Sequence, residues 1–387
     1  MTTFVDACLT TMTTSASQVE RSERSRARPK CARLLKALAG KRNILVTSHL
    51  HPDPDALASC QAMQHLLRKL LHQEKYAGKY SEKSGEKSGE KNSEKSSPKV
   101  TVRLKGQIGG GINSAFTRII KLDFEAWDDD ALADYDAIVL LDTQPQFSNS
   151  PLPPGVVPTA VVDHHRGRGR RTQFAYSDIR IDVGATASIV FSYFMEQHVP
   201  IPSDLGATML YAVESDLAGA AGQQGGLDTI AISQLTLLAD TKRLYQMRYV
   251  DLPQSYYADF ARTIASAMRH ADVIVSHAGE VAFAEVPAVM ADFLLRCEGV
   301  HWALVTAVHD GRFVFSLRTQ STHKSAGEVA RRITSRLGDG GGHFTKAGGA
   351  IPLLSRDQSM IESHRKTLCR RLLRCLHVKV GRGTRLA

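Results

Sequence analysis

The chain has 387 residues, of which 43% are hydrophobic, and a formal net charge of +10. This length is sufficient for two domains with separate cores. No apolar run approaches the ~20 residues of a membrane span, and the first residues lack the basic and apolar regions of a secretory signal. The six scattered cysteines form no C-x-x-C pair, which argues against a zinc knuckle or a disulfide framework. We therefore expect a cytoplasmic protein without a membrane span.

The positive charge is concentrated at the two ends of the chain. Residues 1–43 hold nine Lys/Arg against three acidic residues, and residues 356–387 hold nine against two. Residues 1–28 are rich in Ser, Thr and Arg and are predicted to be a disordered basic tail. We interpret both ends as solvated tails, with contact to RNA or a membrane surface as the alternative.

The first elements predicted are a short helix at 31–40, a buried strand at 43–50 and an amphipathic helix at 56–71. In the following segment, 75–99, lysine recurs at every fourth position with Ser and Gly between. Like charges four residues apart repel on a helix, and there is little apolar surface to bury. This segment is therefore predicted to be a disordered insertion.

Strand and helix patterns alternate through the next part of the chain. The predicted strands are 100–104, 137–142 and 159–165, and the predicted helices are near 112–121, 184–197 and 204–216. This alternation is typical of an α/β fold with an open, mainly parallel sheet flanked by helices.

A second, smaller α/β domain is expected in the last third of the chain. Its predicted strands are 280–286, 301–309 and 312–318, and helices close it. The predicted boundaries are 29–245 for the first domain, 246–275 for a helical connector and 276–380 for the second domain.

Acidic residues and histidines follow three predicted strands of the first domain. The first strand is followed by His49, His51, Asp53 and Asp55, another ends with Asp142, and a third ends with Asp163, His164 and His165. Ligands of open α/β sheets gather outside the carboxyl ends of the strands, so these groups are expected to face one crevice. A single Asp at a strand end is more often a helix cap. The site is indicated by the occurrence of such groups after three strands that end at the same edge of the sheet.

The residue types at this crevice favour metal ions. Several carboxylates in one cleft repel unless cations neutralise them, and oxygen and imidazole ligands without thiolate suit Mn²⁺ or Mg²⁺ better than structural zinc. Two such ions about 4 Å apart can clamp a phosphoryl group for hydrolysis. The sequence therefore predicts a metal site that acts on phosphoryl groups.

Five segments resemble, in order, the successive motifs of the DHH phosphoesterases: SHLHPDPDALAS, LLDTQ, VVDHHR, DVGATAS and AVESD. Residues 163–165 read DHH literally. In the second domain, FSLRTQ and GDGGGHFTKAGGA resemble the DHH-associated domain. The resemblance covers roughly residues 43–355 apart from the insertion, and it is greatest to the branch of nanoRNases, which degrade short oligoribonucleotides, and pAp phosphatases.

The resemblance implies a role for each site residue. One ion would be held by His49, Asp53 and Asp142, and the other by Asp55, Asp142, His164 and Asp216, with Asp142 as the bridge. His165 and Asp163 are the implied catalytic residues, since His165 would contact the substrate phosphate and Asp163 would orient the histidines. The implied substrate-binding residues of the second domain are Arg318, Gly340, Gly341, Gly342 and His343.

The function that the resemblance implies is hydrolysis of phosphoester bonds in short RNA or in small phosphorylated nucleotides such as pAp. The implied cofactor is a pair of Mn²⁺ ions, with Mg²⁺ as the alternative metal. A pyrophosphate or polyphosphate hydrolase stays open, as does a non-catalytic nucleotide sensor on the same fold, although all six ligand positions are intact. Departures from the family pattern are His51, Pro54 and Leu217, and none of them removes a ligand. A homodimer is left open.

Overall fold

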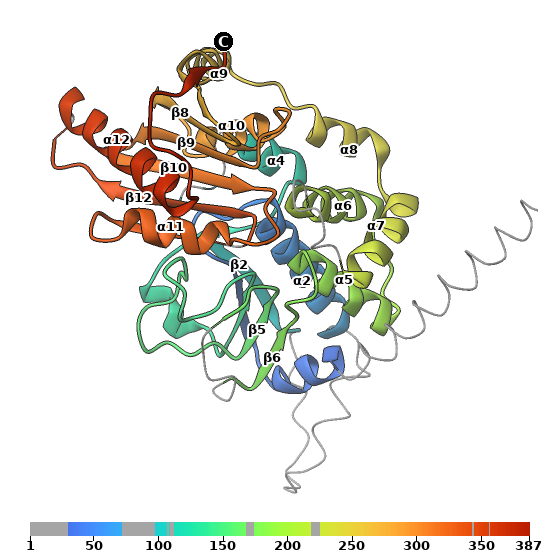
Figure 1. Ribbon diagram of the computed structural model, residues 1–387. Coiled ribbons are helices and arrows are strands. Elements are labelled where there is room, and N and C mark those ends of the chain that lie inside the picture. The colour runs from blue at the N-terminus through green and yellow to red at the C-terminus, as the bar shows by residue number, and fades with distance from the viewer. Residues whose placement is uncertain are drawn as a thin grey trace, which may run out of the picture. The chain divides into compact units, whose positions relative to one another are not determined.

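The computed structural model describes residues 30–71, 97–106, 108, 112–167, 174–217, 225–342, 344–355 and 357–387 (Figure 1). These residues form two compact units, and the main division falls between Val250 and Asp251. The predicted tail at 1–28 and most of the predicted insertion at 75–99 lie outside the described residues. Lys99, the last residue of that predicted insertion, is the first residue of a strand.

The first unit contains a six-stranded sheet in the order β3-β2-β1-β4-β5-β6, in which every pairing is parallel. Its strands are β1 (Asn43–Thr47), β2 (Lys99–Leu104), β3 (Glu125–Ala126), β4 (Ala137–Leu141), β5 (Ala160–Asp163) and β6 (Tyr176–Ile179). The predicted open parallel sheet is confirmed. The strand order reverses between β1 and β4, and this switch point is where doubly wound sheets bind their ligands.

Helices of the first unit cover the sheet and precede or follow its strands (Figure 1). They are α2 (Pro54–Leu71), α4 (Ile112–Ile120), α5 (Thr186–Gln197), α6 (Ser203–Leu217), α7 (Gly226–Leu238) and α8 (Thr241–Arg248), together with helical residues 30–37 and the 3-10 helix η1 (Asp130–Asp134). α2 contacts α5, α6 and three strands. It starts directly after Asp53, whose carboxylate accepts a hydrogen bond from the Ala56 backbone N–H, and Pro54 suits the first helical position.

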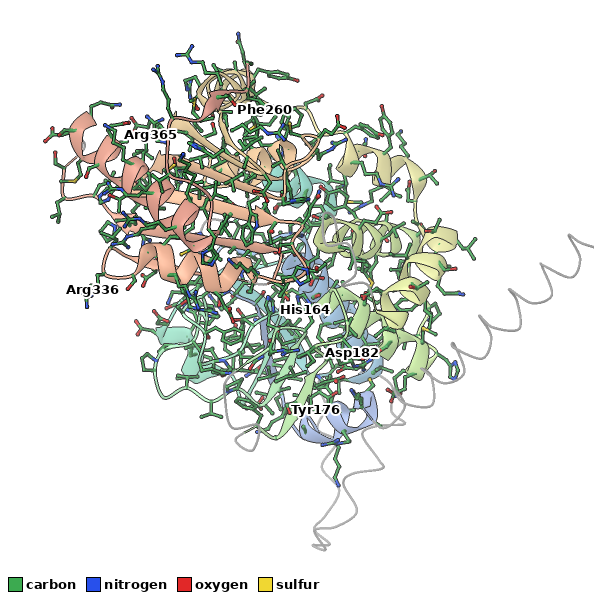
Figure 2. The ribbon with its side chains drawn as sticks, in the orientation of Figure 1. His164, Tyr176, Asp182, Phe260, Arg336 and Arg365 are labelled. Atoms are coloured by element: carbon green, nitrogen blue, oxygen red, sulfur yellow. The ribbon has the colours of Figure 1, made fainter. Side chains whose placement is uncertain are left out.

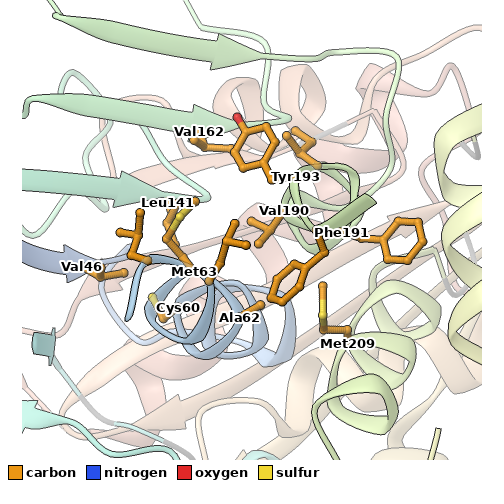
Figure 3. Packing of buried hydrophobic residues seen from close by; sticks show 14 of the residues in the cluster. Val46, Cys60, Ala62, Met63, Leu141, Val162, Val190, Phe191, Tyr193 and Met209 are labelled. Atoms are coloured by element: carbon orange, nitrogen blue, oxygen red, sulfur yellow. The ribbon is translucent and has the colours of Figure 1, made fainter. Parts of the chain in front are cut away.

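The main core of the first unit lies between the sheet and these helices. Val46, Leu141 and Val162 extend from β1, β4 and β5 and pack with Met63 of α2 and Val190 of α5 (Figure 3). The residues one position earlier on the same strands belong to a smaller cluster on the opposite face, because successive side chains of a strand point to opposite sides. Burial on both faces fixes the sheet, and thereby the three loops that follow these strands.

The second unit has a mixed seven-stranded sheet in the order β11-β12-β10-β9-β8-β7-β13. Among the described strands of this second sheet, only β8 and β9 pair parallel. The strands are β7 (Met268–His270), β8 (Val273–Glu280), β9 (Trp302–His309), β10 (Arg312–Thr319), β11 (Asp339–Gly342), β12 (Lys346–Pro352) and β13 (Thr384–Arg385).

Helices pack on both faces of this second sheet. They are α9 (Gln254–Ser266), α10 (Val286–Leu294), α11 (Ala326–Thr334) and α12 (Gln358–Cys375). Trp302 and Leu304 of β9 pack in the cluster that includes α11 and α12, whereas Ala303 and Val305 pack in the cluster that includes α10. The period of two along β9 therefore gives the second unit two cores, one on each face of its sheet.

Two features of the second unit differ from the sequence prediction. The strand predicted at 280–286 is wrong, because these residues comprise the last residue of β8, a loop and the first residue of α10. Val281 and Phe283 pack into the α10 cluster from that loop, so a short alternating pattern does not here mean a strand. The predicted helical connector at 246–275 contains α9 but also β7 and the start of β8. No helix of the described residues is long and apolar enough to cross a membrane.

Candidate metal centre

Carboxylates and imidazoles converge where the strand order of the first sheet reverses. His49 and Asp53 follow β1, Asp142 follows β4 and His164 follows β5, the last marked in Figure 2. In three groups the possible donor atoms lie within 4.8 Å of one another. Two of the groups share no residue: one is His49, Asp53 and Asp142, and the other is Asp55, His164 and Asp216. The third group, Asp142, His164 and His165, links them. The structure thus brings together all six residues that the sequence nominates as metal ligands.

Asp142 lies between the two groups. Its Oδ2 atom is 3.5 Å from His49 Nε2, and its Oδ1 atom is 3.4 Å from His164 Nε2. The side chain of Thr186 donates a hydrogen bond of 2.8 Å to Oδ1, and the carboxylate is buried. The backbone φ angle of 56° is in the left-handed region, which aspartate tolerates better than most residues. Asp142 therefore lies between two imidazoles, with one carboxylate oxygen near each.

Backbone carbonyl groups fix the protonation of two histidine rings. His49 Nδ1 donates to the carbonyl of Leu50 at 2.9 Å, and His164 Nδ1 donates to the carbonyl of Val183 at 3.2 Å. A carbonyl oxygen only accepts, so the proton lies on Nδ1 in the neutral ring and the Nε2 lone pair faces the carboxylates. This second hydrogen bond is the usual support of a metal-ligating histidine.

The carboxylates of Asp53 and Asp55 accept hydrogen bonds at the N-termini of α2 and α5, respectively. Asp55 accepts hydrogen bonds from the backbone N–H groups of Thr186 and Ala187, at 2.7 and 2.8 Å, at the beginning of α5. Asp53 accepts from Ala56 at the beginning of α2. Helix N-termini stabilise anions, so each carboxylate is oriented before any cation binds.

The charges of the cluster are unbalanced without a cation. Burial and the carboxylates of Asp142 and Asp216 raise the pKa of Asp55 well above its usual range. Burial also opposes the charge of Asp142, but hydrogen bonds from His164 and His49 outweigh it and hold its pKa well below the ordinary value. Burial would lower the pKa of His49 and His164, yet neighbouring carboxylates raise both. Divalent cations would replace these imidazolium protons as counter-charges, so the donor set fits a metal centre.

Asp163 and His165 form a hydrogen-bonded pair next to the cluster, with His165 Nδ1 also 3.7 Å from Asp142 Oδ1. The buried carboxylate of Asp163 accepts from His165 Nδ1 at 2.6 Å and from Gln144 Nε2 at 2.7 Å. Gln144 Nε2 also lies 2.9 Å from the carbonyl of His165. A Cβ atom at Gly167 would lie 1.9 Å from Gln144 Oε1, so a larger residue there would displace the Gln144 side chain. Gln144 was missed at the sequence level, and its place in LLDTQ, two residues after Asp142, is the signal that was available.

Asp228 of α7 is a second residue that the sequence analysis missed. Its fully buried carboxylate accepts from the backbone N–H groups of Gly184 and Gly225, at 2.7 and 2.8 Å. Gly184 belongs to the loop between β6 and α5, which also supplies the carbonyl of Val183 to His164 and leads to the N–H groups that hold Asp55. Asp228 therefore positions the loop that orients one half of the cluster.

We expect Asp228→Ala to weaken metal binding about 10- to 100-fold, the range found for residues that orient metal ligands. It also leaves two backbone N–H groups without their acceptor, which costs about 1–3 kcal/mol of stability. The Mn²⁺ concentration for half-maximal activity and the melting temperature measure the two effects, with Asp228→Asn as the isosteric control. A lower melting temperature with unchanged Mn²⁺ dependence would show that Asp228 only stabilises the fold.

The predicted substrate-binding residues of the second unit are described in part. Arg318 lies near the end of β10, where its guanidinium donates to Asp292 at 2.7 Å and to Ser316 at 2.6 Å. Because β10 and β11 both pair antiparallel with β12, Arg318 and Gly342 lie at the same end of this sheet. His343 lies outside the described residues.

Packing accounts for two of the three predicted anion-binding glycines. A Cβ atom would lie 2.6 Å from Thr334 Oγ1 at Gly340 and 2.5 Å from the Lys346 carbonyl at Gly342, whereas at Gly341 it would meet nothing closer than 4.0 Å. An anion-binding role is therefore not needed to explain Gly340 and Gly342, and it stays a prediction for all three.

A doubly wound parallel sheet that carries imidazole and carboxylate groups at its switch point defines an α/β protein with a candidate metal centre. Residues 43–213 match the model of the DHH family, N-terminal domain, so this part of the chain carries a domain of that family.

Relatives extend beyond the matched segment. An uncharacterized protein of Methanocaldococcus jannaschii is 26% identical over 328 residues, which are 84% of this chain and 61% of that protein, so the chain spans about three fifths of the length of this relative. The structure of an exopolyphosphatase-related protein from Bacteroides fragilis is 14% identical, with a TM-score of 0.65 over 88% of this chain and 96% of that chain. RecJ of Thermus thermophilus in complex with Mn²⁺ is also 14% identical, with a TM-score of 0.49 over 93% of this chain and 55% of that chain.

Proposed function

We propose that this chain is a metal-dependent phosphoesterase that hydrolyses phosphoester bonds of short oligoribonucleotides or of small nucleotides such as pAp. The observation that carries the proposal is the position of Asp142, whose two oxygens each face a different imidazole of a different group. We infer two Mn²⁺ ions, with Mg²⁺ as the alternative, since the donors are oxygen and imidazole only. Bound there, two ions would activate water and neutralise the phosphoryl oxygens.

The proposed ligand sets draw on two of the three donor groups, with Asp142 shared between the two ions. One ion would be held by His49, Asp53 and Asp142, and the other by Asp55, Asp142, His164 and Asp216. None of the six needs a large movement to do so, since hydrogen bonds to the backbone already orient the rings of His49 and His164. Groups that are already oriented in this way stabilise the charge of a transition state without first having to reorganise.

His165 is proposed to contact the substrate phosphate. Its Nδ1 atom is occupied by Asp163, so Nε2 is the atom that can donate to a phosphoryl oxygen, and the ring is 22% exposed. Asp163 fixes the orientation of the ring through this hydrogen bond, as a buried carboxylate does for a catalytic histidine elsewhere. His165 would thus stabilise the charge that develops on the phosphoryl group.

Arg318 is proposed to bind a terminal phosphate as a bidentate donor. In the structure its Nε atom donates to Asp292, an exposed carboxylate, and a phosphate would replace that partner. Pairs of this kind at an exposed carboxylate are weak, so the exchange costs little. Gly341, where a Cβ atom would meet no close neighbour, and His343 are proposed to assist.

Chelation is expected to abolish hydrolysis, and Mn²⁺ is expected to restore it better than Mg²⁺ or Zn²⁺. The purified full-length chain would be dialysed against a chelator, reloaded with each metal, and assayed with pAp, dinucleotides, longer RNA, cyclic dinucleotides and pyrophosphate. Turnover of pAp or dinucleotides after reloading with Mn²⁺ supports the proposal. Preference for pyrophosphate or polyphosphate would favour the alternative hydrolase, nucleotide binding without turnover would favour a sensor, and full activity after chelation would contradict the metal mechanism.

A further inference from the structure

A pocket of about 600 Å³ lies at the carboxyl ends of β2 and β3, the same edge of the sheet that carries the candidate metal centre. Its walls include Lys105, Phe124, Trp127 and Asp129. None of the functions derived above uses these residues. The pocket lies wholly in the first unit, and its size is within the range of small-molecule sites.

The indole ring of Trp127 is held in one orientation. Its Nε1–H group donates to Asp129 at 2.7 Å, and Asp129 in turn lies 3.2 Å from the ammonium group of Lys105. That ammonium group is also 5.3 Å from the centre of the Trp127 ring. These contacts lower the pKa of Asp129, first through the indole and then through Lys105, so the carboxylate stays charged. A ring fixed in this way loses little conformational freedom when a ligand binds against it.

Backbone contacts join this pocket to the loop that carries His49 and Asp53. The N–H group of His51, which lies between them, donates to the carbonyl of Lys105 at 3.2 Å. Gly106 packs so closely on the His51 ring that a Cβ atom there would lie 2.9 Å from His51 Nδ1. Since neighbouring strands are about 4.8 Å apart, the pocket is on the order of 10 Å from the metal loop. That separation suits a ligand that occupies both places.

The charge of the pocket excludes a phosphate as its ligand. Asp128, Asp129 and Asp130 outnumber Lys105, so the rim repels anions. A planar ring with N–H donors fits instead, because nucleobases stack on aromatic side chains and donate amino hydrogens to carboxylates. The acidic rim favours bases that carry an exocyclic amino group over uracil.

We propose that the pocket with Lys105, Trp127 and Asp129 is a nucleobase subsite, which binds the base of a nucleotide next to the phosphate that is cleaved. This inference rests on the proposed hydrolysis of short oligonucleotides and specifies which part of such a substrate the first unit recognises. In this proposal, the contacts of His51 with Lys105 and Gly106 fix the position of the pocket relative to the loop that carries His49 and Asp53.

Trp127→Ala is expected to lower kcat/KM for a dinucleotide about 5- to 140-fold, since stacking of one base contributes ~1–3 kcal/mol and 1.4 kcal/mol is tenfold. The same variant should hydrolyse an abasic dinucleotide as the wild type does. Trp127→Phe should retain most of the activity, and Tyr245→Ala, which removes an exposed aromatic ring of α8, is the matched control. Equal losses on both substrates, or no loss on either, would overturn the subsite.

A binding experiment separates this inference from the proposed activity. The chain has two tryptophans, and Trp302 is buried in the second unit, so Trp302→Phe leaves Trp127 as the sole indole reporter. The chelated Trp302→Phe protein should show saturable quenching of Trp127 fluorescence by a dinucleotide but not by pyrophosphate. Quenching without turnover in the Mn²⁺ assay would contradict only the proposed activity. Turnover without quenching would contradict only the subsite.

Discussion

Asp142→Asn is expected to reduce turnover by at least about 10³-fold at saturating Mn²⁺. The amide removes one charged oxygen of the residue that lies between the two ligand groups, 3.5 Å from His49 Nε2 and 3.4 Å from His164 Nε2. One preorganised electrostatic donor contributes 10²–10³ in rate, and loss of a bridging ligand affects both ions. The measurement is kcat for the preferred substrate of the Mn²⁺-loaded chain.

The matched control for Asp142→Asn is Asp123→Asn, the same change at an exposed carboxylate that pairs only weakly with Arg68 at 3.4 Å. It should leave kcat unchanged. Thermal unfolding of both variants tests whether the fold is kept. An Asp142→Asn protein that unfolds like the wild type and retains kcat within tenfold would show that Asp142 does not bridge the ions.

His164→Ala and His165→Ala are expected to fail in different ways. His164 Nε2 faces Asp142 and Asp216, so its loss should weaken Mn²⁺ binding, and excess Mn²⁺ should restore part of the turnover. His165 is tied through Nδ1 to Asp163, so its loss should leave Mn²⁺ binding intact. There kcat should fall on the order of 10²–10³-fold without rescue by metal, because a donor to the phosphoryl group is lost.

Two outcomes of this comparison would contradict the roles assigned to His164 and His165. If His165→Ala loses Mn²⁺ affinity while His164→Ala keeps it, the two roles are reversed. This outcome needs a test because His165 Nδ1 is only 3.7 Å from Asp142 Oδ1. If both variants lose only thermal stability, the two rings merely stabilise the end of β5, and the metal interpretation of this motif is wrong.

The sequence predicted the strands that lie at the centre of the first sheet. β1, β4 and β5 are continuous apolar runs because helices and loops bury both of their faces, and such runs are readable without a structure. β6 was not predicted, because YSDI contains the buried Asp178. Its charge is balanced by Arg180 and by Lys30, which is 148 residues away in sequence. A partner so distant leaves no local pattern.

The candidate ligand residues could be predicted from the sequence, but the residues that position them could not. Acidic and imidazole side chains directly after apolar strands indicate a shared edge, since parallel strands end on the same side. The division into two ligand groups came from the family resemblance, and it remains a prediction that the geometry supports. Asp228 could not be found from sequence, because its value lies in hydrogen bonds to Gly184, which is 44 residues away.

The most direct test of the two-ion site is a calorimetric titration of the chelated full-length chain with Mn²⁺. The account predicts two ions bound per chain for the wild type, with protons released as the raised pKa values of His49 and His164 give way to metal. It also predicts a loss of affinity for both ions in Asp142→Asn. Absence of Mn²⁺ binding by the wild type, or unchanged binding of two ions by Asp142→Asn, would contradict the account.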